Sequence, residues 1–176
     1  MRNALIVLLV LVSSLWFAAC NETPQQPKET DDKQLKESLE KTNRYLINDE
    51  EEDIANYIAR HQLDMVESGT GLRYQILKAG EGETIRQGQT VTFDYELRNI
   101  MGDIVYSSEN DGEKCFTVGH GNVETGLDEA MRYLHKGDVA IVIIPSHLGY
   151  GMLGDQKSIP AYSTLIYTLK IKEVKE

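Results

Sequence analysis

The sequence contains few basic residues and few cysteines, and each shortage argues against a class of function. It has 18 Lys and Arg against 28 Asp and Glu, which gives a formal net charge of −10. A nucleic-acid-binding surface needs basic side chains clustered on one face, and no such cluster occurs, so no nucleic-acid partner is expected. The cysteines are Cys20 and Cys115. If Cys20 carries a lipid, as argued below, no intramolecular disulfide can form.

Ordinary catalytic groups are also missing from settings in which they would be recognised. Ser107 and Ser108 lack a nucleophile-elbow context. The histidines show no metal-ligand spacing; they are His61, His120, His135 and His147. We therefore expect no metal and no cofactor. The remaining candidates for a functional site are aromatic and aliphatic side chains. An apolar cleft with a few polar groups suits an apolar, uncharged ligand such as a prolyl segment.

The N-terminus has the three parts of an export signal: Arg2, an apolar run that extends to Ala19, and the tetrapeptide FAAC at 17–20. The run has about 16 apolar or small residues, fewer than the roughly 20 of a membrane-spanning helix. Small residues before a cysteine resemble the lipobox of bacterial lipoproteins. This implies a signal peptide over 1–19 and lipid attachment at Cys20, where two or more acyl chains give a stable anchor. The alternative is an ordinary cleaved signal followed by an incidental cysteine.

Two segments separate this signal from the main domain. Residues 20–32 are polar and contain two prolines, so they are predicted to form a flexible tether. Residues 33–68 favour helix because apolar residues recur at spacings of three and four: Leu35 and Leu39, then Ile54, Tyr57 and Ile58. The acidic run at 49–53 is expected at the start of a second helix, where carboxylates favour the positive end of the dipole. We interpret that run as a solvated face and not as a metal site.

Residues 69–176 form the main predicted domain. Thr90 to Asn99 alternates strictly between apolar and polar residues, as a strand with one buried face does. Further strands are predicted over 72–78, 104–107, 116–118, 139–144 and 164–174. A single helical stripe, from Leu127 to Leu134, interrupts these strands. The predicted fold class is α+β, with an antiparallel sheet wrapped on one short helix.

Two segments carry a family resemblance: "GQTVTFDYELRNIMGDIVYSS" from residue 88 and "VGHGNVETGLDEAMRYLHKGDVAIVIIPSHLGYGMLGDQKSIPAYSTLIYTLKIKEV" from residue 118. They resemble the N-terminal strands and the C-terminal half of FKBP-type peptidyl-prolyl cis/trans isomerases, over about residues 70–175. The resemblance implies the FKBP-like half barrel, preceded here by a short helical segment. The "IYTLKI" ending, the lipobox and the helical segment look most like the FKBP-like lipoproteins of Bacteroidota, including those associated with gliding motility.

The resemblance also implies a shallow pocket for a proline ring. Its floor would be Leu127, and the Tyr150 hydroxyl would hydrogen-bond a substrate carbonyl. The implied catalytic set is Tyr95, Val123, Leu127, Tyr150, Ile159 and Tyr167. The implied rim is Val105, Tyr106, Phe116 and Glu124. The competing interpretation is that all six residues of the catalytic set belong to the core of a β-rich domain.

The implied reaction needs no proton transfer, because an apolar pocket that removes water from the prolyl carbonyl disfavours the planar amide more than the twisted one. This sequence departs from the family pattern at four positions near the pocket. Val105 and Lys114 stand where aromatic residues are frequent, Tyr106 replaces a common aspartate, and Glu124 replaces a frequent isoleucine. The charges of Lys114 and Glu124 would make the rim wetter. We therefore expect an altered or weaker substrate preference and not an inactive site.

The sequence thus predicts a lipid-anchored prolyl isomerase of the cell envelope that faces the periplasm and assists the folding of exported proteins. Its expected partners are proline-containing unfolded or exported polypeptides and the lipid bilayer, through acylated Cys20. Envelope or motility-machinery proteins are further candidates. One rival hypothesis is a non-catalytic member that binds peptides as a chaperone or motility component. Another treats residues 33–66 as a dimerisation or docking arm.

Overall fold

The computed structural model describes residues 29–121 and 123–176. The predicted signal peptide at 1–19, lipid attachment at Cys20 and most of the predicted tether lie outside the described residues. The chain divides into two compact units, Met1–Arg44 and Tyr45–Glu176. The described part of the first unit belongs to the helix α2, Glu29–His61, which therefore takes in the last residues of the predicted tether.

Helix α2 is continuous, which corrects one sequence prediction. The acidic run at 49–53 lies inside this helix and not at the start of a second one. No glycine or proline occurs between Glu29 and His61, so the chain contains no residue that would interrupt helical hydrogen bonding there. Among the described residues, no helix has the length and apolar character that crossing a membrane requires.

The second unit is built on one antiparallel sheet with strand order β1-β2-β6-β7-β3-β4, and β5 also pairs with β3. The strands are β1 (Val66–Glu67), β2 (Arg73–Lys78), β3 (Thr90–Arg98), β4 (Ile104–Ser107), β5 (Lys114–Thr117), β6 (Val139–Ile144) and β7 (Leu165–Lys175). The helical elements are the end of α2, α3 (Ser108–Asp111), α4 (Thr125–Met131) and the 3₁₀ turns η2 (Ser146–Leu148) and η3 (Gly151–Leu153). The predicted α+β class, an antiparallel sheet with one packed helix, is confirmed.

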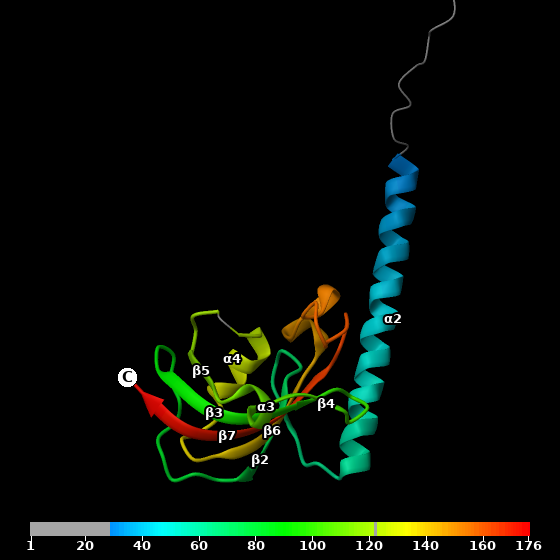
Figure 1. Cartoon of the computed structure of the whole chain (residues 1–176). Coiled ribbons are helices and arrows are strands. Elements are labelled where there is room, and N and C mark those ends of the chain that lie inside the picture. The colour runs from blue at the N-terminus through cyan, green and yellow to red at the C-terminus, as the bar shows by residue number, and fades with distance from the viewer. Residues whose placement is uncertain (1–28, 122) are drawn as a thin grey trace, which may run out of the picture. The chain divides into compact units, whose positions relative to one another are not determined.

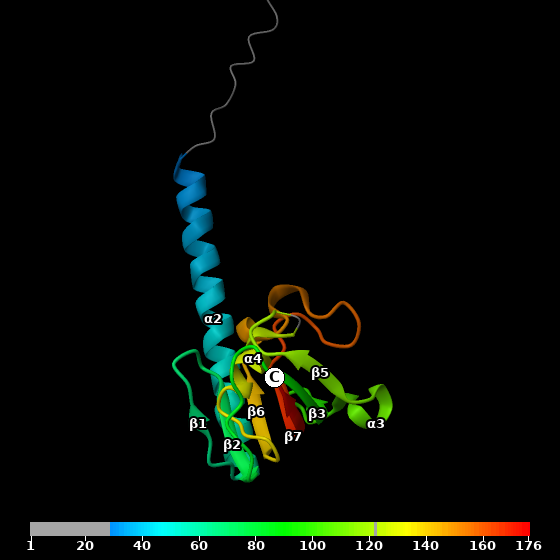
Figure 2. The same ribbon diagram turned by 90° about the vertical axis from the view of Figure 1, so that its left-hand side faces the viewer.

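The main core lies between the sheet and α4, the helix that is seen above the strands in Figures 1 and 2. Strand β3 alternates buried and half-buried residues, with Val91, Phe93 and Leu97 fully buried, as its period of two requires. Leu127 and Met131 of α4 are also fully buried. The loop between β6 and β7 lies on the same side of the strands as α4 in both views.

A second, smaller core lies on the other face of the sheet. Ile54 and Tyr57 near the end of α2 pack with Ile143 of β6 and Ile166 of β7. This explains why Ile166 is buried although it shares a strand face with the half-buried Thr168. The C-terminal part of α2 is therefore an integral part of the second unit.

Candidate functional site

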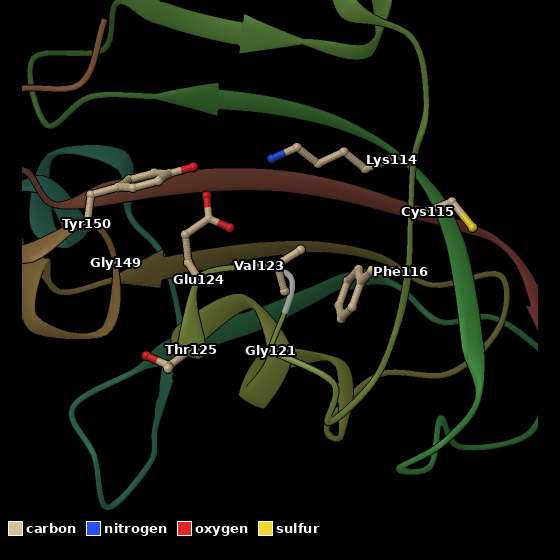
Figure 3. A pocket seen from close by; sticks show the side chains of 9 residues that line it. All are labelled: Lys114, Cys115, Phe116, Gly121, Val123, Glu124, Thr125, Gly149 and Tyr150. Atoms are coloured by element: carbon tan, nitrogen blue, oxygen red, sulfur yellow. The ribbon is translucent and has the colours of Figure 1, made fainter. Parts of the chain in front are cut away.

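A pocket of about 580 Å³ opens where β5, the start of α4 and the loop after β6 meet. Figure 3 shows its lining residues, with the polar ends of Lys114, Glu124 and Tyr150 pointing toward one another. The lining residues are Lys114, Cys115, Phe116, Gly121, Val123, Glu124, Thr125, Gly149 and Tyr150. The pocket is therefore apolar on one side and charged on the other.

Strand pairing brings the side chains of β5 to this pocket. Lys114 pairs with Phe93 and Phe116 pairs with Val91 in the antiparallel β3–β5 ladder. Residues two apart lie on the same strand face, so Lys114 and Phe116 share the face on which Phe93 and Val91 are buried. Cys115 lies on the other strand face and is exposed.

Close packing sets the position of the first turn of α4. A Cβ atom on Gly126 would lie 2.4 Å from Cγ2 of Ile144, so only glycine lets the helix approach β6 this closely. Asp128 accepts a hydrogen bond from the Gly119 amide at 2.5 Å, which ties α4 to the segment that follows β5. Glu124 is the residue just before α4 and lies between Gly119 and Asp128 in the chain, so the bond between these two residues limits its position.

The buried hydroxyl of Tyr167 lies between two charged groups. It donates a hydrogen bond to Oε1 of Glu124 at 2.8 Å and accepts one from Nζ of Lys114 at 3.3 Å. Glu124 is only 7% exposed. This hydrogen bond and the nearby ammonium offset part of the cost of burying its carboxylate.

The Lys114 ammonium also lies over two aromatic rings. Its Nζ is 4.7 Å from the ring centroid of Tyr95 and 5.4 Å from that of Tyr167. The two rings are themselves neighbours, with centroids 6.1 Å apart. Cations bind favourably to ring faces at such distances, so Lys114 covers the aromatic wall of the pocket.

Burial and the Glu124 carboxylate raise the pKa of two tyrosines of the site. The pKa of Tyr167 is raised well above its ordinary value, first by burial and then by Glu124. The pKa of Tyr150 is likewise strongly raised, again first by burial and then by the Glu124 carboxylate. Both hydroxyls keep their protons at neutral pH, and the Tyr150 hydroxyl can donate a hydrogen bond to a ligand when it exchanges the Glu124 carboxylate for the ligand's acceptor.

Asp155 fixes the tip of the loop that carries Tyr150. It accepts hydrogen bonds from the Tyr106 hydroxyl at 2.5 Å and from the Ile159 amide at 2.7 Å. Burial alone would raise the pKa of Asp155, but these hydrogen bonds outweigh it and the pKa is lowered. A carboxylate thus lies beside residue 106, which is itself a tyrosine.

The structure brings part of the predicted site together at the pocket. Val123 and Tyr150 of the predicted catalytic set, and Phe116 and Glu124 of the predicted rim, line it. The other catalytic candidates pack in the main core at 7% exposure or less: Tyr95, Leu127, Ile159 and Tyr167. Of these, Tyr95 and Tyr167 contact Lys114 and so form the wall behind it.

Two predicted rim residues lie away from the lining. Val105 and Tyr106 are half-buried and pack against the main core, and Tyr106 also contacts Asp155. Sequence reasoning missed Cys115, Thr125 and Asp155. An aspartate that directly follows a glycine in a loop, as Asp155 follows Gly154, is a signal for a turn held by its side chain, so Asp155 could have been identified. Cys115 and Thr125 carry no comparable signal.

Comparisons with known proteins identify a matching family. The family model for FKBP-type peptidyl-prolyl cis-trans isomerase matches residues 81–172. The isomerase FkpA of Escherichia coli K12 is 34% identical over 108 residues, 61% of this chain and 39% of that protein. The isomerase Mip of Coxiella burnetii is 31% identical over 106 residues, 60% of this chain and 46% of that protein. The chain therefore spans less than half the length of these curated relatives.

Solved structures show the same fold. The crystal structure of a peptidyl-prolyl cis-trans isomerase from Pseudomonas syringae pv. tomato superimposes with a TM-score of 0.65 at 21% identity, covering 76% of this chain and 96% of that one. The crystal structure of AtFKBP13 gives a TM-score of 0.60 at 25% identity, covering 65% of this chain and all of that one (100%).

Proposed function

This chain belongs to the FKBP-type peptidyl-prolyl cis-trans isomerase family, and from this premise we propose that it accelerates the cis/trans isomerisation of peptide bonds that precede proline. One observation carries the proposal. Tyr150, Val123 and Phe116, which all fall within the family-matched residues 81–172, converge on a single pocket. The pocket thus joins a hydroxyl donor to apolar side chains, which is what binding a prolyl segment requires.

The pocket acts on the amide without exchanging protons with it. The planar amide is stabilised by resonance, and the rotation barrier is about 18–20 kcal/mol. Apolar groups such as Val123 and Phe116 exclude water from the bound bond, so the charge-separated planar form loses more solvation than the twisted form. The Tyr150 hydroxyl donates a hydrogen bond to the substrate carbonyl and holds its orientation. Each ~1.4 kcal/mol of preference for the twisted state raises the rate tenfold.

Replacing the Tyr150 hydroxyl tests this mechanism. Tyr150→Phe is expected to lower kcat/KM for a proline-containing peptide about two- to tenfold, because one net hydrogen bond contributes about 0.5–1.5 kcal/mol. The matched control is Tyr162→Phe, since Tyr162 lies in the same loop, is 45% exposed and is outside the pocket lining. Equal rates for both variants and the wild type would contradict the assigned donor.

A specific observation favours a second candidate function, a peptide-binding chaperone or motility component without catalysis. The Lys114 ammonium covers the Tyr95 and Tyr167 rings, so a proline ring reaches them only if Lys114 moves. Titrating a proline-containing peptide into the wild-type protein distinguishes the two functions. Saturable binding without faster isomerisation supports the chaperone, whereas binding with acceleration supports the isomerase.

We further propose where in the cell the protein acts. The chain is a lipoprotein of the cell envelope, anchored through Cys20 and facing the periplasm, where it assists the folding of exported proteins. The apolar run and the FAAC sequence at 17–20 support this, and with the helical segment they favour the FKBP-like lipoproteins of Bacteroidota, including gliding-associated ones. Cells that express Cys20→Ser should incorporate no labelled palmitate into the protein. Incorporation equal to that of the wild type would contradict lipid attachment at Cys20.

A further inference from the structure

The loop at residues 145–164 connects β6 to β7 and carries two residues of the predicted site, Tyr150 and Ile159. Its two ends lie close together because Ile144 pairs with Leu165 in the β6–β7 ladder. Ser146 is the first residue of the short turn η2, which ends at Leu148, two residues before Tyr150. A displacement of the loop's start is therefore passed on to the pocket within a few residues.

A carboxylate from α2 links the two ends of this loop. Oε1 of Glu50 accepts a hydrogen bond from the Ser146 amide at 2.6 Å and another from the Thr164 hydroxyl at 2.6 Å. Oε2 of Glu50 accepts a third, from the Ser146 hydroxyl, at 2.8 Å. Ser146 is 6% exposed and Thr164 is 5% exposed. Water therefore has little access to replace the carboxylate, and the three bonds are charge-assisted.

The loop is held at further points on the pocket side. The Thr125 hydroxyl at the start of α4 donates to the Leu148 carbonyl at 3.0 Å. Within the loop, the Tyr162 amide donates to the Gly151 carbonyl at 2.8 Å. These contacts make the loop a connected unit, so fixing its base also fixes the position of Tyr150.

Helix α2 does not depend on Glu50 for its attachment. Ile54 and Tyr57 pack with Ile143 and Ile166 on the sheet. Next to Glu50, the Glu51 carboxylate pairs with Arg73 of β2 at 2.6 Å, and Arg73 lies outside the loop. Removing Glu50 therefore frees the loop without detaching the helix.

We propose that Glu50 is a positioning residue for isomerisation: its carboxylate closes the base of the 145–164 loop and thereby holds Tyr150 at the pocket. The inference rests on the proposed function and extends the working site to α2, outside the family-matched residues 81–172. A loop of this length samples many arrangements unless its ends are constrained. Small misplacements of a positioning group cost rate even when they occur far from the reacting bond.

Three variants of the whole chain test the inference. Glu50→Ala removes all three acceptors. Glu50→Gln keeps an oxygen that can accept from both the Ser146 amide and the Thr164 hydroxyl, while its amide nitrogen can donate to the Ser146 hydroxyl. The matched control, Glu51→Ala, removes the neighbouring carboxylate and its ion pair but leaves the loop contacts intact.

The measurements are kcat and KM for a proline-containing tetrapeptide, together with amide hydrogen exchange across residues 146–164. Glu50→Ala should lower kcat/KM about tenfold or more and speed exchange in the loop. Glu51→Ala should stay within about twofold of the wild type in both measurements, and Glu50→Gln should fall between Glu50→Ala and the wild type, because it keeps the three partners but loses the charge. A smaller effect of Glu50→Ala when Ser146→Ala and Thr164→Val are also present would show that the three residues act together.

The outcomes separate this inference from the proposed function. If Glu50→Ala matches the wild type in rate and loop exchange, or Glu51→Ala matches Glu50→Ala in both, the inference is overturned. If the wild type itself does not accelerate isomerisation, the proposed function fails. Amide hydrogen exchange in the loop then still shows whether Glu50 holds the loop.

Discussion

The pocket has an aromatic wall that lies next to two charged side chains. Lys114 lies over the rings of Tyr95 and Tyr167, and Glu124 accepts the hydrogen bond of the Tyr167 hydroxyl. Within residues 29–121 and 123–176, none of the ion pairs involves Lys114. An apolar ligand must therefore displace this ammonium or pack beside it.

Removing the Lys114 charge should improve the turnover of apolar substrates. Displacing a cation from ring faces costs about 0.5–2 kcal/mol, so Lys114→Met should raise kcat/KM for a peptide with an apolar residue before proline by about two- to thirtyfold. Lys170→Met on β7 is the matched control, since Lys170 is exposed and outside the pocket lining. The explanation is wrong if Lys114→Met and Lys170→Met have the same kcat/KM as the wild type.

At the residue scale, part of the predicted residue set lies together at the pocket, but the sequence did not predict how these side chains bond. Val123 and Tyr150 were assigned to the site from their match to a family pattern and Glu124 from its position in that pattern, where isoleucine is frequent; all three line one pocket. The bond between Tyr167 and Glu124 joins residues 43 positions apart, and that between Lys114 and Tyr167 joins residues 53 apart. Such contacts leave no local pattern, so only the folded chain reveals them.

At the scale of elements, the pattern of apolar residues in the sequence predicted the long strands closely. β3 and β6 match their predicted ranges to within a residue, because one buried face produces a regular alternation and a central strand an apolar run. β1 has two residues and α3 has four, too few for any periodicity to appear. From the sequence, the acidic run was expected at the start of a second helix, but the run lies inside α2. Glu50 and Glu51 bond there to residues on distant segments, and a local pattern does not reveal such partners.

The contact between α4 and β6 leads to a stability prediction. In Gly126→Ala, the added Cβ would lie 2.4 Å from Ile144, so the variant should lose about 1–3 kcal/mol of unfolding free energy through overpacking. Urea denaturation measures this loss. Gly69→Ala is the control, because a Cβ there meets nothing within 4 Å and should change stability little. Equal midpoints for the two variants would contradict the tight packing of α4.

At the scale of the whole molecule, the working unit is larger than the family-matched segment. The match begins at residue 81, yet β2 pairs with β6, and the end of α2 packs on the sheet. The compact unit Tyr45–Glu176 includes all of these elements. The segment before residue 81 thus supplies the strands β1 and β2, part of the second core and the Glu50 carboxylate.

The central claim is that the pocket binds a prolyl segment and speeds the turning of its amide bond. NMR exchange spectroscopy on a proline-containing peptide tests it directly, because cis and trans signals are followed separately while the wild-type protein is added. We predict exchange between the two signals at a rate that rises in proportion to protein concentration and falls in Tyr150→Phe. Exchange that stays at the uncatalysed rate, on the order of once in tens of seconds to minutes, would contradict it.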